Sequence, residues 1–446
     1  MGKSASINVH HVTRVEGHGN IVVDLVDGEL TRCDLEIVEA PRFFEALLRG
    51  RPAEEAPRIT CRICGICSVG HATASIQAVE DALGIRPGPR TRKLRRLNMC
   101  GEWFQSHVLH VAFLVAPDAF GAPSVIPLAR SHPEVVRLAL RLKGLANEIC
   151  YTVSGRHVMP ISYLPGGTGR WPTGGELERL HRLLVEARAD VDALVDLFAG
   201  IEWPELRREC ECLAALDEDG AYPMMGGPIH SSLGRTWPTH RYREAVEEYL
   251  VDHSAAKHAR GREGSIRVGA LARYRLAHEL LGWRAQRAAD ALGLDPETTN
   301  PFHYNPAQVV ETVQAHEEAI SLVEELLEDP SPEERAPVTR ARGGEGFGVA
   351  EVPRGTLYHH YVIGPDGRID QANCIIPTGQ NLAAIEDDMR AFVPALLDRS
   401  EDEIAHHLEM LVRAYDPCIS CSVHLLDVRF VRGGRQDASG DEAGGG

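Results

Sequence analysis

The chain has 446 residues and carries 47 lysines and arginines against 64 aspartates and glutamates, which gives a formal net charge of −17. This acidic balance argues against nucleic acid as a partner, because polyanions bind to basic surfaces. Apolar residues make up 43% and charged residues 25% of the chain, an ordinary globular composition that excludes disorder over most of the length.

The first forty residues have the pattern of strands, and a long helical region follows. Segments 7–12, 19–26 and 29–38 alternate apolar and polar residues and are separated by turn signals such as Asp27-Gly28, which indicates a small antiparallel sheet. From Arg42 onward helical periodicity dominates and predicts a helical bundle. Its helices are expected at 43–48, 69–83, 91–116, 134–151, 175–198, 265–292 and 306–327.

The last quarter returns to mixed structure. A loop rich in Pro, Gly and charge is expected at 329–348, a strand pair at 356–363 and 368–376, and helices at 381–397 and 400–414. The predicted fold class is therefore mainly α with small antiparallel β parts (α+β). We expect one domain over residues 1–431, with a β-rich part at 5–40, a helical body at 42–328 and a β/helix part at 349–431, followed by a disordered tail at 432–446.

Two pairs of closely spaced cysteines stand out among the eleven cysteines of the chain. One pair lies in Arg62-Ile-Cys-Gly-Ile-Cys-Ser-Val-Gly-His71, and the other in Asp416-Pro-Cys-Ile-Ser-Cys-Ser-Val-His424. An odd number of cysteines in so long a chain argues against a disulfide framework and for a reducing compartment. The spacing places both sulfurs of a pair on one side of a turn, and four such sulfurs can enclose one soft metal ion.

Zinc is the commonest interpretation of two such pairs. Zinc ribbons, however, separate their pairs by roughly 15–20 residues, whereas most of the chain lies between Cys67 and Cys418. A site built from both ends of a chain sits at the heart of the fold. That arrangement favours a buried, preorganised catalytic centre over a local structural zinc site.

The two motifs resemble the paired signatures of the large, catalytic subunit of nickel–iron hydrogenases, and shorter stretches at 13–18, 42–45, 116–118, 351–355 and 376–381 extend the resemblance. It implies the fold of that subunit, a large helical bundle enclosing a buried metal centre, and reversible heterolytic cleavage of dihydrogen. It further implies that Cys64, Cys67, Cys418 and Cys421 hold nickel. Cys64 and Cys418 would be terminal ligands, and the other two would bridge to an iron that carries carbon monoxide and cyanide.

The same resemblance assigns roles to residues around the metals. Cys418 would take the proton and pass it to Glu16, because a partly buried carboxyl can accept and release a proton. A lone glutamate on a strand edge is more often a surface carboxylate, but Arg14 and His18 beside it favour the functional role.

Arg354, which follows Pro353, would place its guanidinium above the open face of the centre and donate to one cyanide. Asp118 and Asp416 are expected to be the carboxylate partners that a buried arginine needs. The hydroxyl of Thr378 would bind the other cyanide.

Three further residues complete the predicted site. Glu45 and His424 match residues that bind magnesium or its waters in the family, although magnesium prefers oxygen ligands. His71 is expected to hydrogen-bond beside the cluster, and a core histidine with satisfied hydrogen bonds is nearly as consistent with the sequence.

Electrons must leave the site, and the sequence predicts that another subunit takes them. Cys61, Cys64 and Cys67 have the spacing of an iron–sulfur motif, but no fourth cysteine followed by proline completes it. We therefore expect a separate iron–sulfur small subunit, together with further electron-transfer subunits linked either to heterodisulfide reductase or to a flavin and NAD(P). Maturation proteins, a cytoplasmic location and no membrane span are also expected. Segment 425–446 would be either cleaved on maturation or retained.

Two other classes of protein fit part of this pattern. A hydrogen-sensing or zinc-binding protein on the same scaffold would keep the cysteines without catalysis. A quinone-site subunit of respiratory complex I would share the fold, but that lineage lost the thiolates, and this chain keeps all four.

Overall fold

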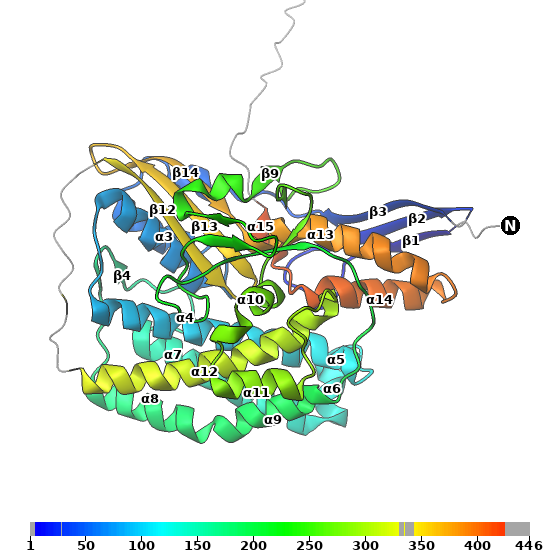
Figure 1. Cartoon of the computed structure of the whole chain (residues 1–446), viewed down its shortest axis with the longest axis horizontal. Coiled ribbons are helices and arrows are strands. Elements are labelled where there is room, and N and C mark those ends of the chain that lie inside the picture. The colour runs from blue at the N-terminus through cyan, green and yellow to red at the C-terminus, as the bar shows by residue number, and fades with distance from the viewer. Residues whose placement is uncertain (1–4, 28, 330–333, 335–342, 424–446) are drawn as a thin grey trace, which may run out of the picture.

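The N-terminal strands form a sheet that projects from the body of the molecule. The computed structural model describes residues 5–27, 29–329, 334 and 343–423. Strands β1 (Ala5–Val9), β2 (Gly19–Val26) and β3 (Glu29–Ile37) pair antiparallel in the order β1-β2-β3. Their buried residues pack with those of α13 (Pro377–Phe392) and α14 (Glu401–Ala414), so both ends of the chain build this side of the molecule (Figure 1).

Long helices form the layer at the bottom of Figure 1. The most central are α4 (Pro89–Leu109), α7 (Pro133–Ser154) and α12 (Tyr304–Glu328). Most residues of α4 and α12 are buried, because other elements cover these helices on several sides. The outer helices of this layer are α8 (Gly174–Glu186), α9 (Arg188–Ala199) and α11 (Trp283–Ala291). A π-helical turn, His110–Val115, joins α4 to α5 (Ala116–Ala119).

A second antiparallel sheet covers α3 (Ser68–Leu83). It consists of β12 (Gly344–Val352), β13 (Gly355–Ile363) and β14 (Ile369–Ile375). Alternate residues of β12 are glycines, and a Cβ added to Gly344, Gly346 or Gly348 would lie about 2 Å from a carbonyl oxygen of α3. Three alanines spaced by four residues on α3, Ala74, Ala78 and Ala82, face these glycines. The small residues let helix and strand approach closely, which fixes the loop before α3 against the turn after β12.

The region 205–264, which sequence patterns left unassigned, forms short strands. One sheet has the order β11-β6-β7-β8, where β11 is Ile266–Arg267, β6 Glu211–Ala215, β7 Ile229–Ser231 and β8 Thr236–Trp237, and a hairpin pairs β9 (Glu247–Tyr249) with β10 (His258–Arg260). The expected helix over 265–292 is wrong in part, since Gly269 has φ +109° and separates β11 from α10, and a loop containing Gly282 precedes α11. The expected loop over 329–348 is also partly wrong because β12 begins at Gly344.

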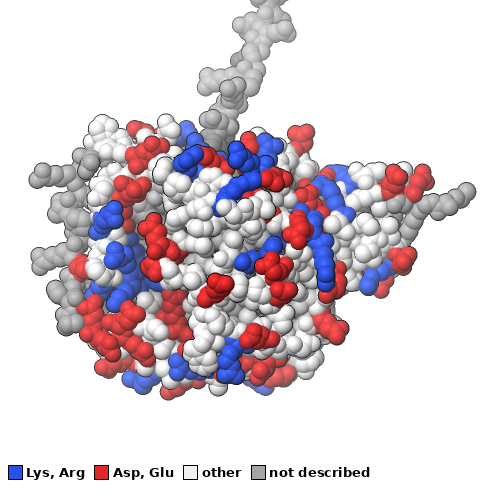
Figure 2. All heavy atoms as spheres, in the orientation of Figure 1, with Lys and Arg blue, Asp and Glu red and all other residues white. Residues whose placement is uncertain are grey.

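The remaining short elements connect these layers. They are α1 (Phe44–Leu48), α2 (Ala56–Thr60), α6 (Val125–Ser131), α10 (Ala270–Ala277), α15 (Ile419–Ser422), β4 (Tyr163–Leu164), β5 (Gly167–Thr168), β6 (Glu211–Ala215), β7 (Ile229–Ser231), β8 (Thr236–Trp237), β9 (Glu247–Tyr249), β10 (His258–Arg260) and β11 (Ile266–Arg267). The predicted α+β class, mainly helical with small antiparallel sheets, is confirmed. None of the helices in the described ranges has both the length and the apolar character that a membrane crossing requires. Acidic and basic side chains are interspersed on the face that Figure 2 shows.

Candidate metal centre

The two ends of the chain meet at the cysteine motifs. Glu16 forms an isolated parallel bridge with Cys418, and its carbonyl oxygen accepts a hydrogen bond of 2.9 Å from the Ile419 N–H. Arg42 joins the two motifs: one guanidinium nitrogen donates to the carbonyl of Ile63, at 2.7 Å, and to that of Ser420. These bonds fix the loop before α3 against the short helix α15.

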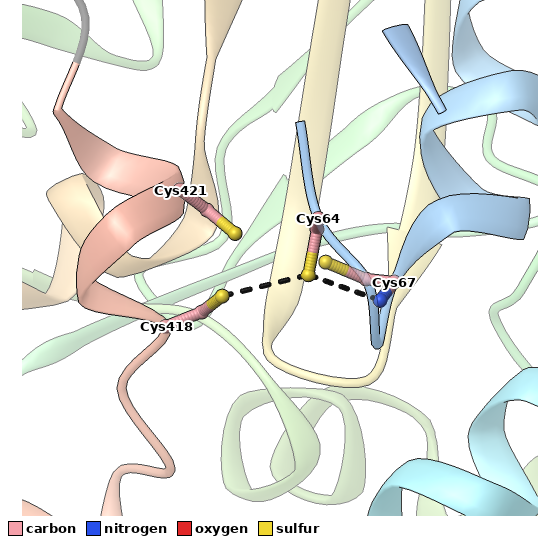
Figure 3. A group of neighbouring side chains, drawn as sticks. All are labelled: Cys64, Cys67, Cys418 and Cys421. Atoms are coloured by element: carbon pink, nitrogen blue, oxygen red, sulfur yellow. Dashed lines mark hydrogen bonds between the residues drawn. The ribbon is translucent and has the colours of Figure 1, made fainter. Parts of the chain in front are cut away.

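The four predicted cysteine ligands lie together in this interface. The sulfurs of Cys64, Cys67, Cys418 and Cys421 all lie within 4.8 Å of one another, and all four residues are buried. Figure 3 shows them pointing toward a common centre, one pair from the loop before α3 and the other from the start of α15. The sulfurs of Cys64 and Cys418 are 3.5 Å apart. Such a donor set fits a soft first-row metal.

The surroundings of Cys64 favour its thiolate. Burial alone would raise the pKa of Cys64, but hydrogen bonds from the neighbouring thiols and the charge of Arg354 lower it well below its usual value. The backbone N–H of Cys67 also donates to the Cys64 sulfur, at 3.1 Å. Burial raises the pKa of Cys418 well above its usual value.

Arg354 lies beside the thiols in the turn between β12 and β13. Its Nε donates to the Asp416 carbonyl at 2.7 Å, and its Nη2 donates to Asp416 Oδ1 at 2.8 Å. Burial would lower the pKa of Arg354, but Asp416 and the nearby cysteines raise it well above its ordinary value, so it stays a cation. Its Nη1 is buried and has no hydrogen-bond partner in the described part of the chain. A free donor therefore remains next to the sulfurs.

Arg273 on α10 holds this turn in place, and sequence reasoning missed it. It donates to the carbonyls of Val352, at 2.9 Å, and Pro353, at 3.0 Å. Its charge is balanced by Glu311, with two bonds of 2.7 Å, and by Glu351, with one of 2.9 Å. An arginine in a helix interior gives no sequence signal for such a role.

Asp118 does not have the expected position. It was predicted to pair with Arg354, but its two carboxylate oxygens accept from Arg14 and Arg413 instead. The π-helical turn after α4 carries Asp118 to these two arginines. The second polar partner of Asp416 is Gln308, whose Nε2 donates to Asp416 Oδ2 at 3.2 Å. Of the two predicted aspartates, only Asp416 contacts Arg354 in the described structure.

Glu16 and Thr378 both reach the second cysteine motif. The hydroxyl oxygen of Thr378 accepts a 2.9 Å bond from the Cys418 N–H, and Oε2 of Glu16 accepts a 3.1 Å bond from the Ser420 N–H. Thr378 is buried, whereas Glu16 is half-buried. Glu16 therefore lies between the cysteines and the solvent.

His71 lies on α3, four residues after Cys67. Its Nδ1 is 3.2 Å from Nε2 of His359, whose Nδ1 is 2.6 Å from the Tyr361 hydroxyl, and its own Nε2 is buried with no partner among the described residues. Burial lowers the pKa of His71 to about 4, so it is neutral. Glu102 on α4 was not predicted either, yet its carboxylate accepts from Val69 and Gly70 at the start of α3. The only sequence signal for Glu102 is that an acidic residue stands within a largely apolar helix face.

Glu45 lies apart from the sulfurs. One of its carboxylate oxygens accepts a 2.8 Å bond from the Cys374 N–H, while Oε2 is buried with no partner among the described residues. Burial raises the pKa of Glu45, and the charge of Lys257 partly opposes this shift. The predicted partner His424 lies outside the described residues.

Sequence comparison identifies the family. The family model described as nickel-dependent hydrogenase matches residues 42–126 and 239–424, which include both cysteine motifs. The chain belongs to the nickel-dependent hydrogenase family. A second family model, described as HoxL-like, matches residues 6–40. The resemblance carried by the motifs is thus confirmed, and the chain is the catalytic large subunit of a nickel–iron hydrogenase.

Several hydrogenase subunits align over nearly the whole chain. The alpha subunit of sulfhydrogenase 1 of Pyrococcus furiosus is 34% identical over 94% of this chain and 98% of its own length. The beta subunit of the NAD-reducing hydrogenase HoxS of Cupriavidus necator is 31% identical over 95% of each chain. The crystal structure of an NAD+-reducing [NiFe]-hydrogenase superposes with a TM-score of 0.84 at 28% identity, covering 94% of this chain and 99% of the other. This hydrogenase subunit therefore shares its fold and length with subunits of multi-subunit enzymes.

Proposed function

We propose that the four cysteines hold nickel, with Cys64 and Cys418 as terminal ligands and Cys67 and Cys421 as bridges to an iron bearing carbon monoxide and cyanide. The observation that carries this proposal is the convergence of four buried sulfurs from the two ends of the chain. When bound, such a centre supplies the heterolytic cleavage of dihydrogen. We also propose that residues 1–431 form one domain, since the site needs both ends.

We infer that Cys418 and Glu16 move the proton. The sulfur of Cys418 accepts it, and the carboxylate of Glu16 passes it toward the solvent. The bridge between the backbones of these two residues supports this role, because it keeps the carboxylate next to the cysteine loop. The partial exposure of Glu16 supports it further, since a proton must leave a buried site.

Arg354 would place its guanidinium over the open face of the nickel–iron centre. Asp416 occupies the Nε–Nη2 edge of the guanidinium, and the unpaired Nη1 is available to a cyanide or to the reacting hydrogen. A preorganised cation in a site without water is worth more than the same charge in solvent. Thr378 would donate its hydroxyl proton to the other cyanide while its oxygen accepts from Cys418, and His71 would donate from Nε2 to a thiolate.

We propose a magnesium ion at Glu45. The unpartnered, buried Oε2 of this residue supports the proposal, because a buried carboxylate oxygen needs a cation or a donor. His424 would bind the ion or one of its waters.

We propose that electrons pass to an iron–sulfur small subunit, then to further subunits that reduce a soluble acceptor in the cytoplasm. Maturation proteins would load the metals. The names of the relatives support this assignment, because one is the alpha subunit of a sulfhydrogenase and another the beta subunit of an NAD-reducing enzyme. A third relative, from the F420-non-reducing hydrogenase of Methanothermobacter marburgensis, is 30% identical over 94% of this chain.

Metal analysis and infrared spectroscopy of the purified complex test the proposed centre. We expect one nickel and one iron per chain, with infrared bands of iron-bound carbon monoxide and cyanide. Cys421→Ser should lose both metals and hydrogen oxidation. Cys61→Ser is the matched control, because Cys61 is equally buried beside the motif but lies outside the group of four sulfurs. Zinc alone in the wild-type protein would refute the proposal.

A further inference from the structure

A second group of metal-ligating side chains lies away from the cysteines. Ligand atoms of His253, His258 and Glu386 all lie within 4.8 Å of one another. His253 belongs to the loop between β9 and β10, His258 begins β10, and Glu386 lies on α13. Strand β3 completes the surroundings, because the Leu35 N–H donates to Glu386 Oε1 at 3.1 Å. The β9–β10 hairpin and strand β3 therefore both reach one carboxylate of α13.

The histidines face the same oxygen of Glu386. Nε2 of His253 is 2.7 Å from Oε1, and Nε2 of His258 is 3.5 Å from it. His258 is only 1% exposed, yet neither of its ring nitrogens has a hydrogen-bond partner among the described residues. Leaving a buried polar group unpaired costs about 1–3 kcal/mol. A bound cation accounts for this unpaired imidazole.

The charge at the site suits a cation. Burial would raise the pKa of Glu386, but the neighbouring imidazoles of His258 and His253 and the hydrogen bond from the Leu35 N–H lower it to about 2. The carboxylate is therefore ionised. Arg390 contacts the other oxygen, Oε2, at 3.3 Å, so Oε1 remains directed at the histidines. The side chain of His253 is 21% exposed, which leaves a path for an ion and a water.

We propose that His253, His258 and Glu386 bind a divalent first-row transition-metal ion, with zinc as the best match. Two imidazoles and one carboxylate form a known set of three protein ligands for zinc, and water takes the fourth position. Binding at Nε2 requires the neutral imidazole of His253 to carry its proton on Nδ1, so the ion takes the place of the hydrogen bond between His253 Nε2 and Glu386 Oε1. The ion would join the β9–β10 hairpin to α13, beside β3. This site shares no ligand with the proposed nickel–iron centre.

Zinc analysis and X-ray absorption at the zinc edge, on the purified complex after zinc loading and desalting, test this site. We expect about one zinc per chain with nitrogen and oxygen neighbours at ~2.0–2.1 Å, whereas zinc in the cysteine cluster would show sulfur at ~2.3 Å. His258→Ala and Glu386→Gln should each lose this zinc. His181→Ala is the matched control because it removes a surface histidine that pairs with one carboxylate, Glu324, at 2.8 Å.

The same measurements can overturn the proposal. It fails if the loaded wild-type complex holds no zinc with nitrogen and oxygen neighbours, or if His258→Ala and Glu386→Gln keep it. If His258→Ala does not fold, His253→Ala at the partly exposed rim replaces it, and retention of the zinc by that variant refutes the site. We also expect a chelator to lower the Tm of the wild-type complex and to leave that of the variant unchanged.

Discussion

Arg273 provides the sharpest test of how the fold holds the turn that carries Arg354. Arg273→Met removes the cation that pairs with Glu311 and Glu351 while keeping an apolar chain over the ring of Trp103, whose centre lies 4.2 Å from the guanidinium carbon. Breaking a buried ion pair costs about 3–5 kcal/mol, because the other charge stays buried without a partner. With about 2.1 cal/mol/K per residue, a chain of 446 residues has an unfolding entropy of about 0.9 kcal/mol/K. We therefore expect the Tm to fall by about 3–5 °C.

Calorimetry of the purified complex measures this shift, and two variants make the result decisive. Arg141→Met removes an arginine with a similar two-bond contact, to Asp190, but Arg141 is 56% exposed. Exposed pairs contribute about 0–1 kcal/mol, so the Tm should change by about 1 °C or less. Adding Glu311→Gln to Arg273→Met should recover part of the loss, because it removes one unpaired charge. Equal shifts for Arg273→Met and Arg141→Met would refute the reasoning.

Three other substitutions test the site and its support. Arg354→Lys keeps the charge but loses the paired Nε and Nη2 contacts with Asp416, so kcat should fall by about 10²–10³ while nickel and iron stay bound; loss of the metals would contradict this role. Glu16→Gln should keep the metals and slow hydrogen–deuterium exchange at the active site, and Glu16 has no part in proton transfer if exchange equals that of the wild type. Gly346→Ala should destabilise the subunit by about 1–3 kcal/mol, since its Cβ would lie 2.1 Å from the Ala78 carbonyl oxygen. Gly144→Ala on α7, whose added Cβ meets nothing within 4 Å, should instead raise stability, and denaturant titration of both variants measures the two changes.

Sequence patterns predicted the group of four converging cysteines better than the residues that surround it. The cysteine spacing is a local feature, so Cys64, Cys67, Cys418 and Cys421 could be named before their positions were known. The pairing of Arg354 depends on where a π-helical turn directs Asp118, and no periodicity encodes that turn. The glycine-rich first half of β12, residues 344–348, lies in the predicted loop because its close packing on α3, not strand propensity, makes it a strand.

The charged side chains around the cysteines explain why most residues that hold the site in place could not be predicted from the sequence. The half-buried Arg42 and the buried Arg354 each join segments that are distant along the chain, and each donates to main-chain carbonyls near the cysteines. A buried arginine contributes little net stability, because desolvation offsets most of its attraction. Its rigid, planar donors instead fix the position of a loop. A site made of two loops from opposite ends of a chain needs such fixation, since neither loop belongs to a long helix or strand. The buried arginines therefore fix the positions of the loops and add little net stability to the fold. For this reason Arg273→Met is expected to disturb both the site and the fold.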